Sequence, residues 1–238
     1  MKLAGLQKLS LLDYPDKICA IVFTPGCNFR CPFCHNPDLV RPNRPSYALG
    51  EEGVEEFLAF LKTRQSRLDG ICLTGGEPLL QEGVDLFLRR VKELGFLVKL
   101  DTNGSFPDRL EALLGEKLVD YVAMDVKNTL PLYARTVGLS EVDGPALQRS
   151  RDTIIQTAPD YEFRTTVVRP FHGDNLPAGE SLIEAIGQWL KGAKRWVLQN
   201  YRKTGPQLSD EPMRAFSKEE MALLAEKARR HVPEVLLR

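Results

Sequence analysis

Six short apolar runs, separated by amphipathic segments, leave this chain few folds to adopt. The runs are rich in β-branched residues and lie at 17–24, 71–74, 96–100, 121–126, 163–168 and 195–198. Apolar residues at helical spacing predict helices over 54–61, 84–91 and 221–228, with weaker patterns over 145–157 and 182–190. Strands that alternate with helices indicate an α/β fold with a parallel sheet and right-handed crossovers.

The whole of 1–238 is expected to form a single domain, since no repeat, low-complexity tract or linker interrupts the pattern. Ser217 and Glu220 have the capping-box spacing that would start the last helix. In folds with a parallel sheet, ligands bind at the carboxyl ends of the strands. The polar motifs of this sequence fall at such ends.

Three cysteines after the first predicted strand point to metal or redox chemistry. Cys27, Cys31 and Cys34 have C-x3-C-x2-C spacing, and nearby prolines disfavour a regular helix, so we expect a curled loop. Three thiolates on a four-iron cluster leave one iron without a protein ligand, as suits a catalytic centre. The alternatives are a plain cluster or a structural zinc site that also uses His35.

The other two cysteines are expected to be buried core residues. Cys19 and Cys72 lie within predicted strands, and free cysteine is among the most buried residue types.

Polar motifs close three further strands. They are Gly75-Gly76-Glu77-Pro78, Asp101-Thr102-Asn103-Gly104 and Met124-Asp125-Val126-Lys127. Glycine lets the backbone approach a ligand closely, and a carboxylate pairs with an ammonium group. The structural alternatives are an ordinary turn at the glycines, an Asx turn at Asp101 and Asn103, and a solvated charge at Lys127.

Together these motifs resemble the radical S-adenosylmethionine superfamily. Its signature is a C-x3-C-x-aromatic-C loop, in which Phe33 fills the aromatic position, followed by Gly-Gly-Glu-Pro on the next strand. The resemblance implies an incomplete parallel (β/α)6 barrel, which is a partial TIM barrel. It also implies a [4Fe-4S] cluster on Cys27, Cys31 and Cys34, with S-adenosyl-L-methionine as the second cofactor.

The same resemblance assigns residues to cofactor binding: Phe33, Gly75, Gly76, Glu77, Asp101, Asn103, Lys127 and Arg202. Phe33 would lie beside the adenine, and Glu77 would bind the amino group of the methionine moiety. Asp101 would lie near the ribose or a small cation, and Lys127 would face the methionine carboxylate or the ribose. Arg202 departs from the family pattern, since relatives carry a His or another polar group toward the ribose at this place.

The cysteine-loop flanks and strand-end motifs resemble those of activating enzymes for glycyl radical enzymes. Residues 10–15 are similar to the branch that activates anaerobic ribonucleoside-triphosphate reductase. This implies that a 5'-deoxyadenosyl radical abstracts hydrogen from a glycine of that partner enzyme. Arg164 would be the basic residue that activases tend to carry on the fifth strand, and an ordinary ion pair is the alternative interpretation. Residues 171–175 and 201–205 would rim the opening toward the partner.

Only one cluster is implied, because the chain has five cysteines and no ferredoxin-like module. A flavodoxin or ferredoxin would therefore supply the electron.

Charge and hydropathy argue against two classes of function. Acidic and basic residues balance at 32 each, which leaves no surplus of positive charge for nucleic acid. No stretch approaches the roughly 20 apolar residues of a membrane span, and no secretory signal is recognisable. We expect a cytoplasmic protein.

Two other functions remain open. The first is a radical enzyme that acts on a small molecule, similar to 7-carboxy-7-deazaguanine synthase, and it would need a closed polar pocket. The second is a non-catalytic iron–sulfur or zinc protein.

Overall fold

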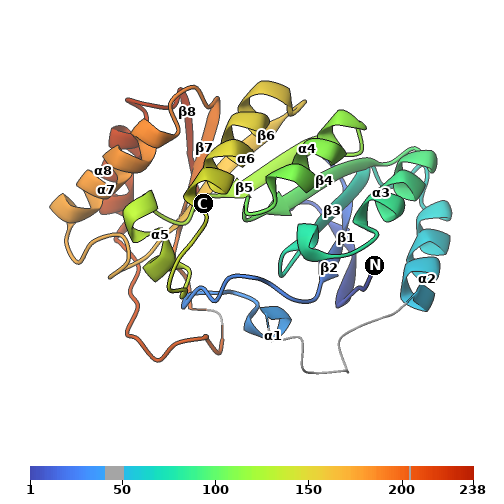
Figure 1. The fold of residues 1–238 in the computed structure, drawn as a ribbon, viewed down its shortest axis with the longest axis horizontal. Coiled ribbons are helices and arrows are strands. Elements are labelled where there is room, and N and C mark those ends of the chain that lie inside the picture. Colours follow the sequence, from blue (N-terminus) through green and yellow to red (C-terminus); the bar gives the residue numbers. More distant parts are fainter. Residues whose placement is uncertain (41–50, 204) are drawn as a thin grey trace.

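The computed structural model describes residues 1–40, 51–203 and 205–238, arranged around one eight-stranded sheet (Figure 1). The strands are β1 Gly5–Ser10, β2 Cys19–Thr24, β3 Gly70–Gly75, β4 Leu97–Thr102, β5 Tyr121–Asp125, β6 Tyr161–Val167, β7 Arg195–Asn200 and β8 Glu234–Leu237. The helices are α1 Pro37–Val40, α2 Glu51–Lys62, α3 Val84–Glu93, α4 Pro107–Gly115, α5 Leu130–Thr136, α6 Gly144–Thr157, α7 Leu176–Trp189 and α8 Lys218–Ala228.

The strands lie in chain order from β1 to β8. β1 is antiparallel to β2, and every later neighbour is parallel. Within the described ranges no pairing joins β1 to β8, so the sheet stays open like a partial barrel. The expected α/β class is confirmed, and all six predicted strands form. The parallel set has seven members instead of six, because the four-residue strand β8 was too short to recognise.

The predicted helices are also present, with one shifted boundary. α7 begins at Leu176, before the apolar pattern starts near Leu182, because Asn175 caps it by accepting a hydrogen bond from the Ala178 N–H. Ser217 and Glu220 form the expected capping box at α8. None of the helices in the described ranges is long and apolar enough to span a membrane.

The two faces of the sheet bury different kinds of residue. The face toward the helices packs into a large apolar core that includes Trp196 and Leu100. On the inner face, a small apolar cluster covers part of β2 to β5 and contains both Cys19 and Cys72, which confirms their burial. Further along the inner face, β4 to β6 carry charged side chains such as Arg164, and the site lies there.

Candidate functional site

One cavity lies at the carboxyl ends of β3 to β6, under the loop that carries the three cysteines. The volume of this cavity is about 170 Å³. Ten of the eleven residues predicted for the site line it: Cys27, Cys31, Cys34, Phe33, Gly75, Gly76, Glu77, Asp101, Asn103 and Lys127. A second hollow lies on the outer surface beside α6, where Arg149 already pairs with Asp108 and Glu111. The chemistry-bearing residues thus gather at the first cavity.

The cysteine loop is irregular from Pro25 to Asn36, as its prolines predict, and α1 starts at Pro37. Burial raises the pKa of the Cys27 thiol to about 11 and that of Cys31 to about 12. Bound metal deprotonates such thiols, because only the thiolate is a strong ligand.

Gly75, the last residue of β3, and Gly76, which follows it, hold the strand end against this loop. A Cβ added at Gly76 would lie 1.9 Å from the Gly26 carbonyl oxygen, so no side chain fits there. Gly75 has φ +121°, a conformation that side-chain-bearing residues rarely adopt. The Glu77 N–H donates to the same Gly26 carbonyl at 2.8 Å. Local sequence therefore fixes the distance between the cysteines and the strand end.

Glu77 is fully buried in the cavity wall. Its carboxylate accepts hydrogen bonds from the Leu79 N–H at 3.0 Å, the Thr102 hydroxyl at 2.9 Å and the Asn103 N–H at 2.7 Å. Burial nevertheless raises the pKa of Glu77 to about 7. A cation beside Glu77 would favour the ionised form, which makes this carboxyl suited to an ammonium group.

Asp101, near the end of β4, and Asn103, the first residue after β4, have different partners. The Asn103 side-chain oxygen accepts a hydrogen bond from the Ser105 N–H at 3.0 Å, which is the Asx turn considered above, and its amide donates to Asn28 at 2.8 Å. The Asp101 carboxylate instead forms ion pairs with Lys99 and Arg164. Asn103 therefore braces the cysteine loop, and Asp101 belongs to a charged network.

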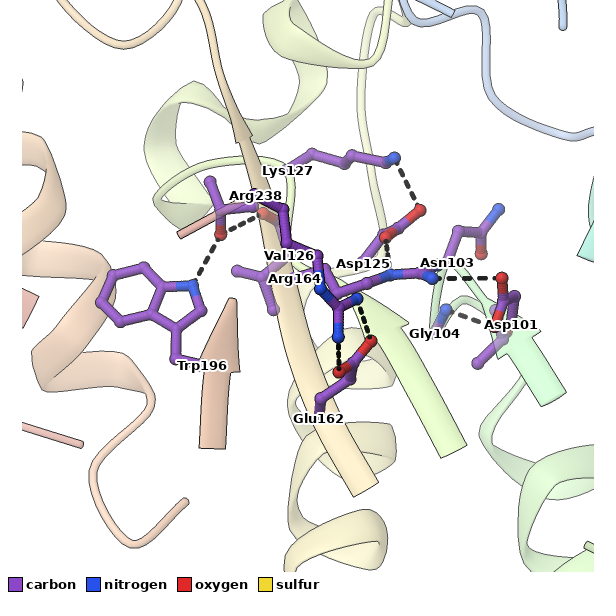
Figure 2. Close-up of polar contacts among 12 residues, drawn as sticks. Asp101, Asn103, Gly104, Asp125, Val126, Lys127, Glu162, Arg164, Trp196 and Arg238 are labelled. Atoms are coloured by element: carbon purple, nitrogen blue, oxygen red, sulfur yellow. Dashed lines mark hydrogen bonds and ion pairs between the residues drawn. The ribbon is translucent and has the colours of Figure 1, made fainter. Parts of the chain in front are cut away.

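A row of alternating charges crosses the inner face of the sheet, as Figure 2 shows in part. Arg164 on β6 lies between two carboxylates, with Asp101 at 3.1 Å and Asp125 at 2.9 Å, and Asp125 also pairs with Lys127 at 2.9 Å. Lys99 completes the row beyond Asp101. Burial opposes ionisation of Asp125, but the charges of Arg164 and Lys127 hold its pKa below the usual range. The row carries one excess positive charge, which favours an anionic group in the cavity.

The aromatic residue of the loop is also in place. Phe33 is buried and packs on Phe171, with ring centroids 5.7 Å apart.

His172 is fully buried, and its ring bonds to the Lys127 carbonyl at 2.9 Å. The first three residues of 171–175 are thus buried, and only Asp174 and Asn175 of this segment are exposed.

Arg202 is not brought to the cavity. β7 ends at Asn200, Tyr201 turns into the core, and Arg202 is exposed outside the cavity lining. Arg202 is thus the one predicted site residue that the structure does not bring together with the other ten. Sequence reasoning did not assign Asp125 and Thr166, which line the cavity at the ends of β5 and β6. The signal was available for Asp125, because it stands in the strand-end motif before Lys127.

The donor set fits an iron–sulfur cluster. Three cysteine thiols of one loop line one cavity, next to a glycine-lined strand end. Three thiolates would hold a four-iron cluster and leave one iron without a protein ligand.

Comparisons with known proteins place the motifs in a wider group. Residues 21–145 match the profile of the radical SAM superfamily. A Methanocaldococcus jannaschii protein, whose name assigns it to the glycyl-radical enzyme activating enzymes, is 32% identical over 99% of this chain and 95% of its own length. The pyruvate formate-lyase-activating enzyme of Clostridium pasteurianum is 32% identical over 53% of this chain, and the 7-carboxy-7-deazaguanine synthase of Methanopyrus kandleri is 38% identical over 45%. The chain spans about half the length of these last two relatives.

Solved structures share the fold. Streptococcus suis SuiB bound to the precursor peptide SuiA has a TM-score of 0.67, 14% identity, and matches 92% of this chain and 48% of that one. TYW1 with a lysine-pyruvate adduct has a TM-score of 0.61, 17% identity, and matches 90% and 74%. The enzyme anSMEcpe with bound AdoMet has a TM-score of 0.58, 14% identity, and matches 90% and 61%. At these identities the likeness establishes the fold and leaves the substrate open.

Proposed function

Because the chain belongs to the radical SAM superfamily, whose members use a [4Fe-4S] cluster and S-adenosylmethionine, we propose that it is a glycyl radical enzyme activase. Its partner would be an anaerobic ribonucleotide reductase, and 1–238 would act as one catalytic domain. The proposal rests on one observation: the three cysteines and the polar ends of four strands meet in a single cavity. The Methanocaldococcus jannaschii relative matches almost the whole length of this chain and is named for activation of glycyl radical enzymes, which supports the choice of substrate class.

When bound, the two cofactors supply one-electron cleavage of the sulfonium C–S bond to methionine, followed by hydrogen abstraction by the resulting 5'-deoxyadenosyl radical. The electron would come from a flavodoxin or ferredoxin. The chain's own residues would bind the two cofactors and orient them. Cys27, Cys31 and Cys34 would hold the cluster. The Glu77 carboxylate would accept a hydrogen bond from the amino group of the methionine moiety.

The charged row would bind the other polar groups of S-adenosylmethionine. Lys127 faces the cavity and belongs to the row that carries one excess positive charge, so it would take the methionine carboxylate. The Asp101 carboxylate, held by its ion pair with Arg164, would accept a hydrogen bond from a ribose hydroxyl. Phe33 would pack against the adenine and exclude water from that end of the cavity.

Replacing the cysteines tests the cluster. We expect anaerobically reconstituted wild type to hold about four irons. Alanine at Cys27, Cys31 or Cys34 should abolish iron binding, whereas alanine at the buried core residues Cys19 and Cys72 should retain it. Iron content and visible absorption are the measurements. Zinc alone restoring a stable fold, with no iron–sulfur absorption, would contradict the assignment.

The partner is tested by electron paramagnetic resonance. Reduced enzyme is mixed with S-adenosylmethionine and the anaerobic ribonucleotide reductase of the same organism. A doublet-like glycyl radical signal that depends on this enzyme is the expected result. A reductase that stays radical-free under conditions where 5'-deoxyadenosine is released would count against the activase role.

A second candidate is a radical enzyme that acts on a small molecule. The match to 7-carboxy-7-deazaguanine synthase favours it, because its identity of 38% over the matched segment exceeds that of the activases. Stimulation of 5'-deoxyadenosine release by a purine-like or pterin-like molecule, with no glycyl radical, would select this function.

A further inference from the structure

Three polar side chains form a rung across the inner face beside the cavity. Thr166 on β6 is in register with Gln199 on β7. Arg238 follows β8, and its N–H donates to the Leu198 carbonyl at 3.0 Å while its carbonyl accepts from the Asn200 N–H at 2.9 Å, which sets it beside Gln199. Because side chains of a strand alternate between faces, these three point to the inner face.

The rung begins at the cavity and runs to the edge of the sheet. Thr166 lines the cavity, and β8 is the last strand of the sheet in the described ranges. Neighbouring strands are about 4.8 Å apart, so the rung covers about 10 Å. An extended peptide rises about 3.3 Å per residue, so three residues would span this length.

Arg238 is held in one orientation. Its guanidinium donates two bonds to Glu162, at 3.2 and 3.1 Å, and Figure 2 shows it lying beside Arg164. Glu162 is itself buried and also accepts a hydrogen bond from the Tyr121 hydroxyl at 3.1 Å. The Arg238 side chain remains 41% exposed. Arginine has five N–H donors, so three are left for a ligand.

The other two members of the rung have unused hydrogen-bonding capacity. Among the described residues, neither the Thr166 hydroxyl nor the Gln199 amide has a hydrogen-bond partner, and neither is an enclosed unsatisfied group. Both can donate and accept, whereas Arg238 only donates. A peptide main chain presents one donor and one acceptor at every residue, which matches this pattern.

We propose that the Thr166–Gln199–Arg238 rung binds the extended main chain of the partner and leads its glycine to the cavity. This inference rests on the proposed function, since it names the contact through which an activase would hold a protein substrate. A row that runs from the cavity to the sheet edge suits a chain that enters from outside.

The test measures binding of a labelled peptide centred on the radical glycine of the anaerobic ribonucleotide reductase. Fluorescence anisotropy is recorded with reconstituted enzyme and S-adenosylmethionine. Gln199→Ala and Arg238→Ala should each raise the dissociation constant of the peptide about threefold to tenfold, the loss expected for one or two hydrogen bonds. The KM for the full-length reductase should rise together with the dissociation constant of the peptide, while kcat changes less.

Two controls keep the result interpretable. Arg149→Ala removes an arginine of similar exposure from ion pairs on the outer surface, and it should leave peptide binding unchanged. Gln199→Ala breaks no bond among the described residues, so it folds even if the loss of Arg238 destabilises the protein.

Wild-type affinity in both rung variants would overturn the proposal, and so would a wild type that does not bind the peptide. The proposed function is decided separately, by whether wild type generates a glycyl radical on the full-length reductase.

Discussion

Replacing Glu77 with Gln should remove a pH dependence of stability that arises because the Glu77 carboxyl is buried. Burial raises the pKa of the Glu77 carboxyl from its ordinary 4.5 to about 7, despite hydrogen bonds from Asn103, Leu79 and Thr102 that favour the ionised form. In the unfolded chain the carboxyl ionises near its ordinary pKa. Between about pH 4.5 and pH 7, the folded state therefore still holds a proton that the unfolded state has released.

The sign follows from linkage. The contribution of Glu77 to stability is fully present below about pH 4.5 and is lost as the pH rises through about 7. At about 1.4 kcal/mol for each pKa unit, the difference amounts to about 3 kcal/mol, of which about 2.5 kcal/mol is lost between pH 5 and pH 8. Glutamine does not ionise, so the variant lacks this loss.

The assay is urea unfolding of reduced, cluster-free protein at pH 5 and pH 8, followed by circular dichroism. Between these pH values, the free energy of unfolding of Glu77→Gln should rise by about 2.5 kcal/mol relative to wild type. Glu82→Gln, in an exposed loop, is the matched control and should show no such change. Parallel loss of stability in wild type and Glu77→Gln would refute the reasoning that burial controls this carboxyl.

Two further substitutions test the packing and the charged row. Gly76→Ala should lower both the melting temperature and the iron content after reconstitution, because its Cβ would overlap the Gly26 carbonyl, whereas Gly115→Ala, with nothing within 4 Å, should lower neither. Lys99→Met should reduce the free energy of unfolding by about 3–5 kcal/mol, since it leaves a buried carboxylate without one partner. Lys92→Met, which breaks a partly exposed Lys–Asp pair on the outside, should cost at most about 1 kcal/mol in the same urea assay.

Local patterns predicted most of the elements, and their failures have local causes. Polar residues interrupt β1, whose sequence is Gly-Leu-Gln-Lys-Leu-Ser, so it has no continuous apolar run. α4 and α5 are short and begin with proline in the first turn, which hides them from a search for long helical periodicity. Arg202 lies two residues beyond the end of β7 and is exposed, and local sequence does not show whether a residue past a strand end will line the cavity.

The sequence alone determined the features that depend on neighbours along the chain. The cysteine spacing, the glycines before Glu77 and the strand–helix alternation were all legible, because each is a local pattern with a direct chemical meaning. From these, the fold class and ten cavity residues could be predicted.

Only the tertiary structure decided which charges meet. Lys99 and Asp101 share a face of β4 by their spacing, but nothing in β4 shows that Arg164 of β6 will lie between Asp101 and Asp125. The same holds for the rung: Thr166 lies on β6, Gln199 on β7, and Arg238 directly after β8. Cross-strand neighbours are set by the register of the sheet, which is fixed by the packing of all the strands and helices together and is not written in any one of them.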